Sequence, residues 1–150
     1  MQLNEFNDVI EFALKREREA VEFYQECSHL ARNDAMKEAF LEMKEEEKGH
    51  VRMLENFNPD QIEEIKIQEI QNLKIADYIV NVKYEPNMSY KEVLELAMKR
   101  EESAYHLYTD LSARAKDPNM TKLFQVLAQE ELKHKNRFEQ EYDDMVFQED

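Results

Sequence analysis

The stretch Glu47-Lys48-Gly49-His50 places a glutamate and a histidine three residues apart, and the same spacing returns at Glu131-Leu132-Lys133-His134. On a helix, residues three apart lie on one face, with side chains roughly 5–6 Å apart. A carboxylate and an imidazole at this spacing can therefore bind one cation together. Because the chain is rich in glutamate, either stretch alone is a weak signal. Its repetition carries the fold prediction.

The repeat covers most of the sequence, because a shift of 84 positions lays the second half on the first without a gap. The residues Ala-Leu-Lys-Arg-Glu at 13–17 match Ala-Met-Lys-Arg-Glu at 97–101. Further matched pairs are Ala20 with Ala104, Tyr24 with Tyr108, Met36 with Met120, Phe40 with Phe124, and Glu46 with Glu130. Each half is therefore predicted to be a helical hairpin. Its first helix supplies one glutamate and its second helix supplies Glu-x-x-His.

Apolar residues recur at helical intervals in four segments, and capping residues mark where these segments start. The predicted elements are a helix over about 8–31 capped by Asn7 or Asp8, a second helix from Asn33 or Asp34 to about 57, a crossover over 58–88 with one or two short helices, a third helix capped by Ser89, and a fourth from Asp117 to about 146. Two antiparallel hairpins joined by a long crossover form an all-α four-helix bundle with pseudo-twofold symmetry.

The composition agrees with an all-helical protein that forms one domain over 1–150, since its 150 residues include a single Gly and only three Pro. The formal net charge of −14 argues against nucleic-acid and anionic membrane partners. The single cysteine, Cys27, excludes an internal disulfide and any Cys-x-x-Cys metal site. The amino terminus lacks the pattern of a secretory signal, so we expect a cytoplasmic protein.

Six polar residues fall on the apolar faces of the four predicted helices: Glu17, Glu47, His50, Glu101, Glu131 and His134. A buried carboxylate is costly unless it is paired or binds a metal. Four glutamates would bring a formal charge of −4 into the bundle, which two divalent ions cancel, and imidazole favours iron, manganese or zinc over calcium. The sequence therefore predicts a site for two metal ions. The alternative is a metal-free bundle with solvated glutamates.

These motifs, Glu17-x-x-Ala20-x-x-x-Tyr24 with Glu47-x-x-His50 and their repeats at 101–108 and 131–134, resemble the rubrerythrin-like branch of the ferritin superfamily over nearly the whole chain. The resemblance implies a ferritin-like fold and a non-haem di-iron centre. By this likeness the six residues are metal ligands, and Glu47 and Glu131 bridge the two ions. Tyr24 and Tyr108 would lie behind the ligands as candidate catalytic residues and hydrogen-bond ligand carboxylates.

The resemblance also implies a function: an oxidoreductase whose di-iron centre reacts with hydrogen peroxide or dioxygen. The alternative is an iron-binding protein of the ferritin superfamily that stores or delivers iron. A homodimer or higher homo-oligomer is expected, and the 58–88 crossover leaves open whether a hairpin is exchanged with a neighbour.

Two departures separate this sequence from typical rubrerythrins. Full-length rubrerythrins carry a rubredoxin-like domain with paired Cys-x-x-Cys motifs, and this sequence has none, so an external donor such as a rubredoxin-like protein is expected to supply electrons. Typical rubrerythrins also place an extra glutamate one turn after the ligand of the third helix and lack a histidine in the fourth. Here those positions are Ala104 and His134, so the predicted ligand set resembles the symmetric centres of bacterioferritins.

Other polar and reactive residues have simpler interpretations. His29 and His106 lack counterparts in the repeat and are predicted to lie on the surface. Cys27 is predicted to be a small core residue, and Glu45 and Glu46 to be solvated. Gly49 is unusual inside a helix, where a close helix contact or water access beside the neighbouring histidine would explain it.

Overall fold

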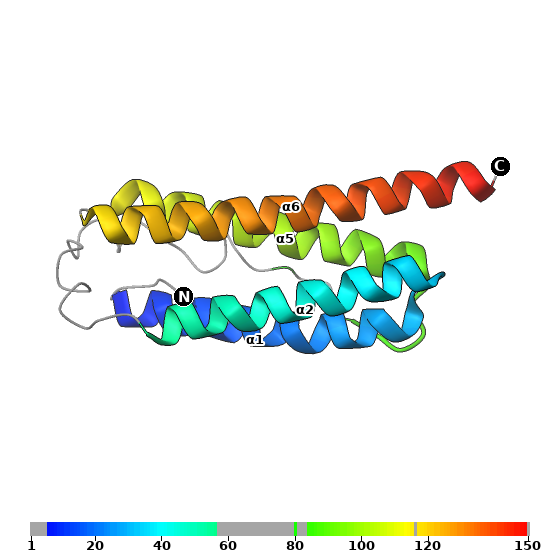
Figure 1. The fold of residues 1–150 in the computed structure, drawn as a ribbon, viewed down its shortest axis with the longest axis horizontal. Coiled ribbons are helices and arrows are strands. Elements are labelled where there is room, and N and C mark those ends of the chain that lie inside the picture. The colour runs from blue at the N-terminus through cyan, green and yellow to red at the C-terminus, as the bar shows by residue number, and fades with distance from the viewer. Residues whose placement is uncertain (1–5, 57–79, 81–83, 116, 150) are drawn as a thin grey trace.

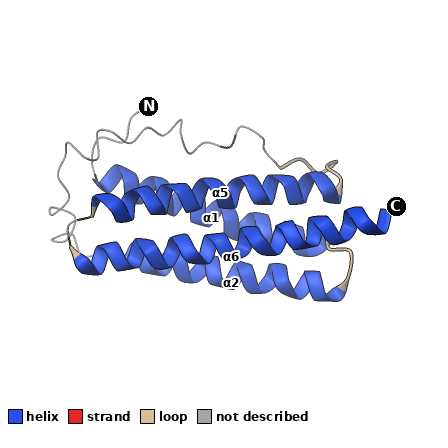
Figure 2. Ribbon diagram, turned by 90° about the horizontal axis from the view of Figure 1, so that it is seen from above, coloured by secondary structure: helices blue, strands red, loops and turns tan. Residues whose placement is uncertain are grey.

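The computed structural model describes residues 6–56, 80, 84–115 and 117–149, and this part of the chain contains four α-helices. They are α1 (Phe6–Leu30), α2 (Asp34–Glu55), α5 (Tyr90–Arg114) and α6 (Pro118–Glu149). Helix α1 pairs with α2 and α5 pairs with α6, and the two hairpins lie side by side (Figures 1 and 2). This arrangement confirms the predicted all-α bundle of two hairpins.

The connection between the hairpins spans the length of the bundle, because α2 ends at the left of Figure 1 and α5 begins at the right. The long crossover is therefore confirmed. The short helices predicted within 58–88 lie outside the described residues, and so does the question of where that segment packs. The single domain over 1–150 stays a prediction.

Three of the four helix starts follow the predicted capping chemistry. The side chain of Asn33 accepts a hydrogen bond from the backbone N–H of Met36 at 2.9 Å. Ser89 and Glu92 form a reciprocal capping box, with both bonds at 3.1 Å. Asp117 accepts from the backbone N–H of Met120 at 3.2 Å, directly before the proline that opens α6.

The predicted cap of the first helix is wrong, because α1 already begins at Phe6 and both Asn7 and Asp8 lie within its first turn. Asp8 is favourable there for a different reason, since a negative charge near a helix N-terminus interacts well with the helix dipole. The last helix also extends further than predicted, to Glu149 in place of about 146.

The core consists of two apolar clusters at opposite ends of the bundle. One joins the start of α1 and the end of α2 to the end of α5 and the start of α6, and includes Val9, Ala13, Leu54, Leu107, Leu111, Met120, Phe124 and Leu127. The other joins the remaining ends and includes Phe23, Cys27, Met36, Phe40, Val93, Leu94, Ala97 and Phe138. The six polar residues singled out by the sequence lie between these clusters, so apolar packing on both sides fixes their height.

Gly49 faces open space, since an added Cβ would meet only Nη2 of Arg52, at 3.8 Å. The close helix contact considered for this residue is therefore not present among the described residues. Glycine in a helix interior costs roughly 0.5–1 kcal/mol relative to alanine. We expect Gly49→Ala to raise the free energy of unfolding by this amount, as measured by urea denaturation. Metal binding at the neighbouring His50 serves as the control and should not change; a destabilised variant would contradict the prediction.

No helix among the described residues is both long enough and apolar enough to cross a membrane.

Candidate metal centre

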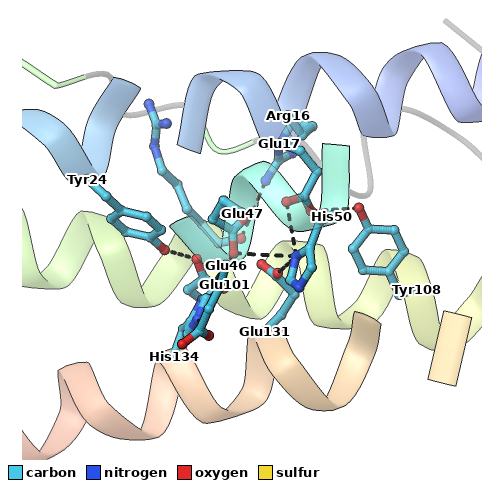
Figure 3. A network of polar contacts seen from close by, with 11 residues as sticks. Arg16, Glu17, Tyr24, Glu46, Glu47, His50, Glu101, Tyr108, Glu131 and His134 are labelled. Atoms are coloured by element: carbon cyan, nitrogen blue, oxygen red, sulfur yellow. Dashed lines mark hydrogen bonds and ion pairs between the residues drawn. The ribbon is translucent and has the colours of Figure 1, made fainter. Parts of the chain in front are cut away.

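The structure brings the six predicted ligand residues together at the middle of the bundle (Figure 3). One glutamate comes from α1 and one from α5, while α2 and α6 each supply a glutamate and a histidine. All six are buried, with exposed fractions of at most 3%: Glu17, Glu47, His50, Glu101, Glu131 and His134. The helical spacing of the two Glu-x-x-His stretches has thus placed both pairs on inward faces.

The donor atoms form two overlapping sets, and each set lies within 4.8 Å. The first set consists of Glu17, Glu47, His50 and Glu131, and the second consists of Glu47, Glu101, Glu131 and His134. Glu47 and Glu131 belong to both sets. Because a carboxylate has two oxygens, each of these residues can donate to two neighbouring cations at once. The geometry agrees with the predicted bridging positions, although the role of these residues as ligands stays a prediction.

Both histidines turn their Nδ1 atoms toward the carboxylates. Nδ1 of His50 lies 2.9 Å from Oε1 of Glu131 and 3.3 Å from Oε2 of Glu17. Nδ1 of His134 lies 3.1 Å from Oε1 of Glu47. Imidazole nitrogen and carboxylate oxygen are the donors that first-row divalent metals accept. Each set therefore presents one nitrogen and several oxygens to a common point.

Several of these donor atoms are buried without a hydrogen bond, although buried polar atoms normally have one. They are Oε1 and Oε2 of Glu47, Oε2 of Glu101, Oε1 of Glu131 and Nδ1 of His134. Their short contacts with one another lack the alignment of hydrogen bonds. A layer of buried polar atoms without hydrogen bonds is costly in a protein alone and becomes favourable when cations are bound. The residues present therefore fit a pair of metal ions.

Burial and mutual repulsion shift the protonation of the cluster. Burial and the nearby carboxylate of Glu131 raise the pKa of Glu47 well above its ordinary value, and burial with the same neighbour raises the pKa of Glu101. Burial opposes the charged form of His50, but the carboxylates of Glu131 and Glu17 outweigh it and raise the pKa of His50 to about 10. The carboxylates around His134 raise its pKa as well. Without metal, the raised pKa values favour protonated side chains within the cluster.

Metal uptake at this cluster should release these protons. Ligation needs the neutral histidine and the ionised carboxylate, so protons compete with metal. The pKa of His50 is raised to about 10 and that of His134 is also raised, so both rings carry a proton at neutral pH that binding must displace. We expect at least about two protons released per chain and an affinity that rises with pH between 6 and 8. Calorimetry in buffers of different ionisation enthalpy measures this number, and uptake without proton release would contradict it.

The two tyrosines bond to glutamates across the pseudo-twofold axis. The hydroxyl of Tyr24, on α1, donates to Glu101 on α5. The hydroxyl of Tyr108, on α5, donates to Oε1 of Glu17 on α1 at 2.6 Å. Both rings are buried, with exposed fractions of 1%. The hydrogen bonds expected from the sequence are thus present, and each tyrosine orients the glutamate of the opposite half (Figure 3).

Glu46 has a role that the sequence did not indicate. Its Oε2 lies 2.8 Å from Nε2 of His134, and this contact lowers the pKa of Glu46. Glu46 is exposed, as predicted, but its carboxylate also turns inward to contact the histidine, which the sequence did not indicate. A carboxylate on the outer nitrogen of a metal-binding histidine fixes the ring orientation. The matching Glu130 pairs with Lys133 at 3.6 Å, so the repeat symmetry is broken here.

The other sequence predictions near the bundle core hold. Cys27 is fully buried, and burial raises the pKa of its thiol beyond the range in which a thiolate forms. His29 and His106 are exposed, as predicted. None of these three residues belongs to either donor set.

A small cavity of about 20 Å³ reaches the carboxylates from the seam between α1 and α5. It is lined by the four glutamates of the cluster, by two alanines and by two arginines: Glu17, Glu47, Glu101, Glu131, Ala20, Ala104, Arg16 and Arg100. The repeat matches the two arginines to each other. No function was predicted for them, because a cationic side chain beside a glutamate in an acidic chain is usually a surface pair.

Comparisons with known proteins agree with this geometry. A crystal structure from Thermotoga maritima, described as a ferritin-like diiron-carboxylate protein, superimposes with a TM-score of 0.75 at 21% sequence identity, and covers 95% of this chain and 97% of that chain. At this identity the likeness establishes the fold. No curated protein gives a significant match. The family model for rubrerythrin matches residues 8–142, which include all six predicted ligands and both tyrosines. The chain therefore belongs to the rubrerythrin family.

Proposed function

We propose that this protein is a non-haem di-iron oxidoreductase that reduces hydrogen peroxide or dioxygen with electrons from an external donor. One observation carries the proposal: the two donor sets share Glu47 and Glu131, so that they could hold two cations side by side. The rubrerythrin family and the diiron-carboxylate description of the Thermotoga protein favour iron over manganese or zinc. When bound, a pair of iron ions supplies the two electrons needed to cleave an O–O bond.

The protein's own residues hold and shield this chemistry. Glu17 and Glu101 each receive a hydrogen bond from a tyrosine, which fixes one carboxylate oxygen and leaves the other facing the cluster. Apolar clusters on both sides keep bulk water away from the layer.

The electron donor is proposed to be a separate protein. The chain contains one cysteine, so it has no Cys-x-x-Cys pair for an iron centre of the rubredoxin type. A rubredoxin-like protein is the donor that the family suggests. The acidic chain, with a net charge of −14, would associate best with a donor that presents a basic surface.

The test begins with iron-loaded protein, reduced without oxygen and then mixed separately with hydrogen peroxide and dioxygen. Repeated turnover of peroxide in the presence of a rubredoxin and its reductase, at a rate above that of free iron, is expected. The Glu47→Gln and Glu131→Gln double variant should lose this turnover. If iron is oxidised once per site and then accumulates as mineral in a large hollow particle, the oxidoreductase proposal fails and the alternative of iron storage is supported.

A further inference from the structure

The cavity at the α1–α5 seam is lined by the four glutamates of the cluster and by two partly exposed arginines, Arg16 and Arg100, which we call its mouth. Two alanines at matched positions, Ala20 and Ala104, line it, and their short side chains leave the seam open beside the glutamates. A volume of about 20 Å³ is enough for roughly one water molecule or a ligand of similar width. This part of the seam is thus sized for a very small ligand.

Both cations at this mouth are held in place. Arg16 donates from Nη2 to the backbone carbonyl of Arg100 at 3.5 Å, and so reaches across the seam. The guanidinium of Arg100 lies over the ring of Phe23, 4.7 Å from its centroid. Both arginines are partly buried, and each directly precedes a glutamate of the cluster in the sequence. Their charges therefore stay at the mouth and are not dispersed in solvent.

The two arginines are not equivalent, and the sequence explains why. Arg100 lies over Phe23 on the other helix of the seam, whereas the position matched to Phe23 in the second half is Leu107, and Arg16 lies instead over Phe12 of its own helix, 5.7 Å from the ring centroid. Arg100 also lines a wider outer pocket of about 530 Å³, together with Phe23, Tyr84 and Lys44. Arg100 is the residue that the inner cavity and the outer pocket have in common. It therefore stands between the wide pocket and the cluster.

The lining of the cavity carries two arginines and four glutamates. Two bound divalent ions would cancel the charge of the four carboxylates, and the two guanidinium groups would then give the lining a net positive charge that attracts anions, although the whole chain has a net charge of −14. Guanidinium also offers planar N–H donors, which suit small anions with lone pairs.

We propose that Arg16 and Arg100 form an anion-selecting mouth, through which small anions of one to three heavy atoms, such as azide or hydroperoxide, reach the metal cluster. This inference rests on metal binding at the cluster, as in the proposed function, but it does not depend on turnover.

Azide binding to the iron-loaded, oxidised full chain tests the proposal, followed by the optical absorption of the bound anion. We expect Arg16→Gln with Arg100→Gln to weaken azide binding about tenfold, equivalent to about 1.4 kcal/mol. The association rate should also lose most of its dependence on salt. Iron content and the rate of iron uptake should not fall. The matched control is Arg18→Gln on the same helix, whose exposed side chain pairs with Glu55 at 3.4 Å; it should change azide binding less than twofold.

A second pair of variants separates charge from packing. Arg16→Lys with Arg100→Lys keeps both charges and should retain azide affinity within about threefold, while the glutamine pair loses it. Equal losses in the lysine and glutamine pairs, or unchanged azide affinity in the glutamine pair, would overturn the proposal. Since azide binding needs no electron donor, the proposed oxidoreductase activity can fail in the turnover assay while azide still binds in an arginine-dependent way. Absence of iron from the wild-type chain would refute both.

Discussion

Replacing both Glu47 and Glu131 with glutamine should abolish tight binding of the two metal ions while leaving the metal-free bundle folded. Both residues belong to both donor sets, so each set loses two carboxylates in the double variant. We expect at least about a hundredfold loss of affinity, because even residues that only orient metal ligands are worth 10–100-fold. The amides keep the shape of the buried side chains. They also remove the repulsion between the two carboxylates, which raises the pKa of Glu47 in the unchanged protein.

Thermal unfolding with and without metal measures this effect. A ligand present at about a thousand times its Kd stabilises the folded state by about 4 kcal/mol. For a chain of this length, each kcal/mol shifts Tm by about 2–4 °C. Iron or a stable substitute ion should therefore raise the wild-type Tm by about 8–16 °C and that of the double variant hardly at all.

The control for this prediction removes two carboxylates from the same helices. Glu45 and Glu139 are exposed, and each pairs with a nearby lysine, at 3.3 and 3.6 Å. Their replacement by glutamine should leave the metal-dependent shift in Tm intact. A double variant of Glu47 and Glu131 that still takes up two ions per chain would rule out the assignment of the centre.

Glu141→Ala should destabilise the fold by about 2–4 kcal/mol, although it lies away from both donor sets. Glu141 is buried, and Arg32 donates to both of its oxygens, at 2.7 and 3.0 Å. The hydroxyl of Tyr90 donates to the same carboxylate at 2.9 Å. The alanine leaves both donors without this acceptor, and a hydrogen bond to a charged group is worth about 1.5–3 kcal/mol. Because the Arg32 side chain is 25% exposed, water recovers part of the loss.

Urea denaturation measures the cost of Glu141→Ala, and metal content should stay unchanged. Glu139→Ala, an exposed change on the same helix, is the matched control and should cost less than about 0.5 kcal/mol. Combining Glu141→Ala with Arg32→Met should recover part of the loss, because the cation that Glu141 bound is then removed as well. Equal effects of the two alanine variants would contradict the role of Glu141 as a clamp between the hairpins.

The sequence predicted the fold and the six clustered residues because both depend on local periodicity. Apolar spacing defines the helices, and the shift of 84 positions aligns Glu17 with Glu101 and His50 with His134. A residue on the inward face of each of four helices is bound to meet its counterparts once the helices pack. Helix starts at Ser89 and Asp117 followed for the same reason, since capping is a contact between near neighbours in sequence.

Contacts between distant residues could not be predicted in this way. Glu141 binds Arg32 and Tyr90 from other elements, and no spacing rule connects them. Glu46 follows the repeat in sequence, yet its side-chain rotation toward His134 distinguishes it from Glu130, which turns to a lysine. Glu46 and Glu130 differ because each adopts the side-chain conformation that has the lower free energy in the packed bundle. That conformation cannot be predicted from residue identity alone.

The crossed tyrosine bonds have a consequence for how the site could be assembled. Glu17 is oriented by Tyr108, and Glu101 by Tyr24, so neither hairpin contains a complete half-site. A complete site needs an α1–α2 hairpin packed against an α5–α6 hairpin, and the two hairpins can come from one chain or from two. A second hairpin from a neighbouring copy would bring the same hydroxyls to the same carboxylates. The geometry of the centre therefore depends on the packing of the two hairpins and not on whether they belong to the same chain.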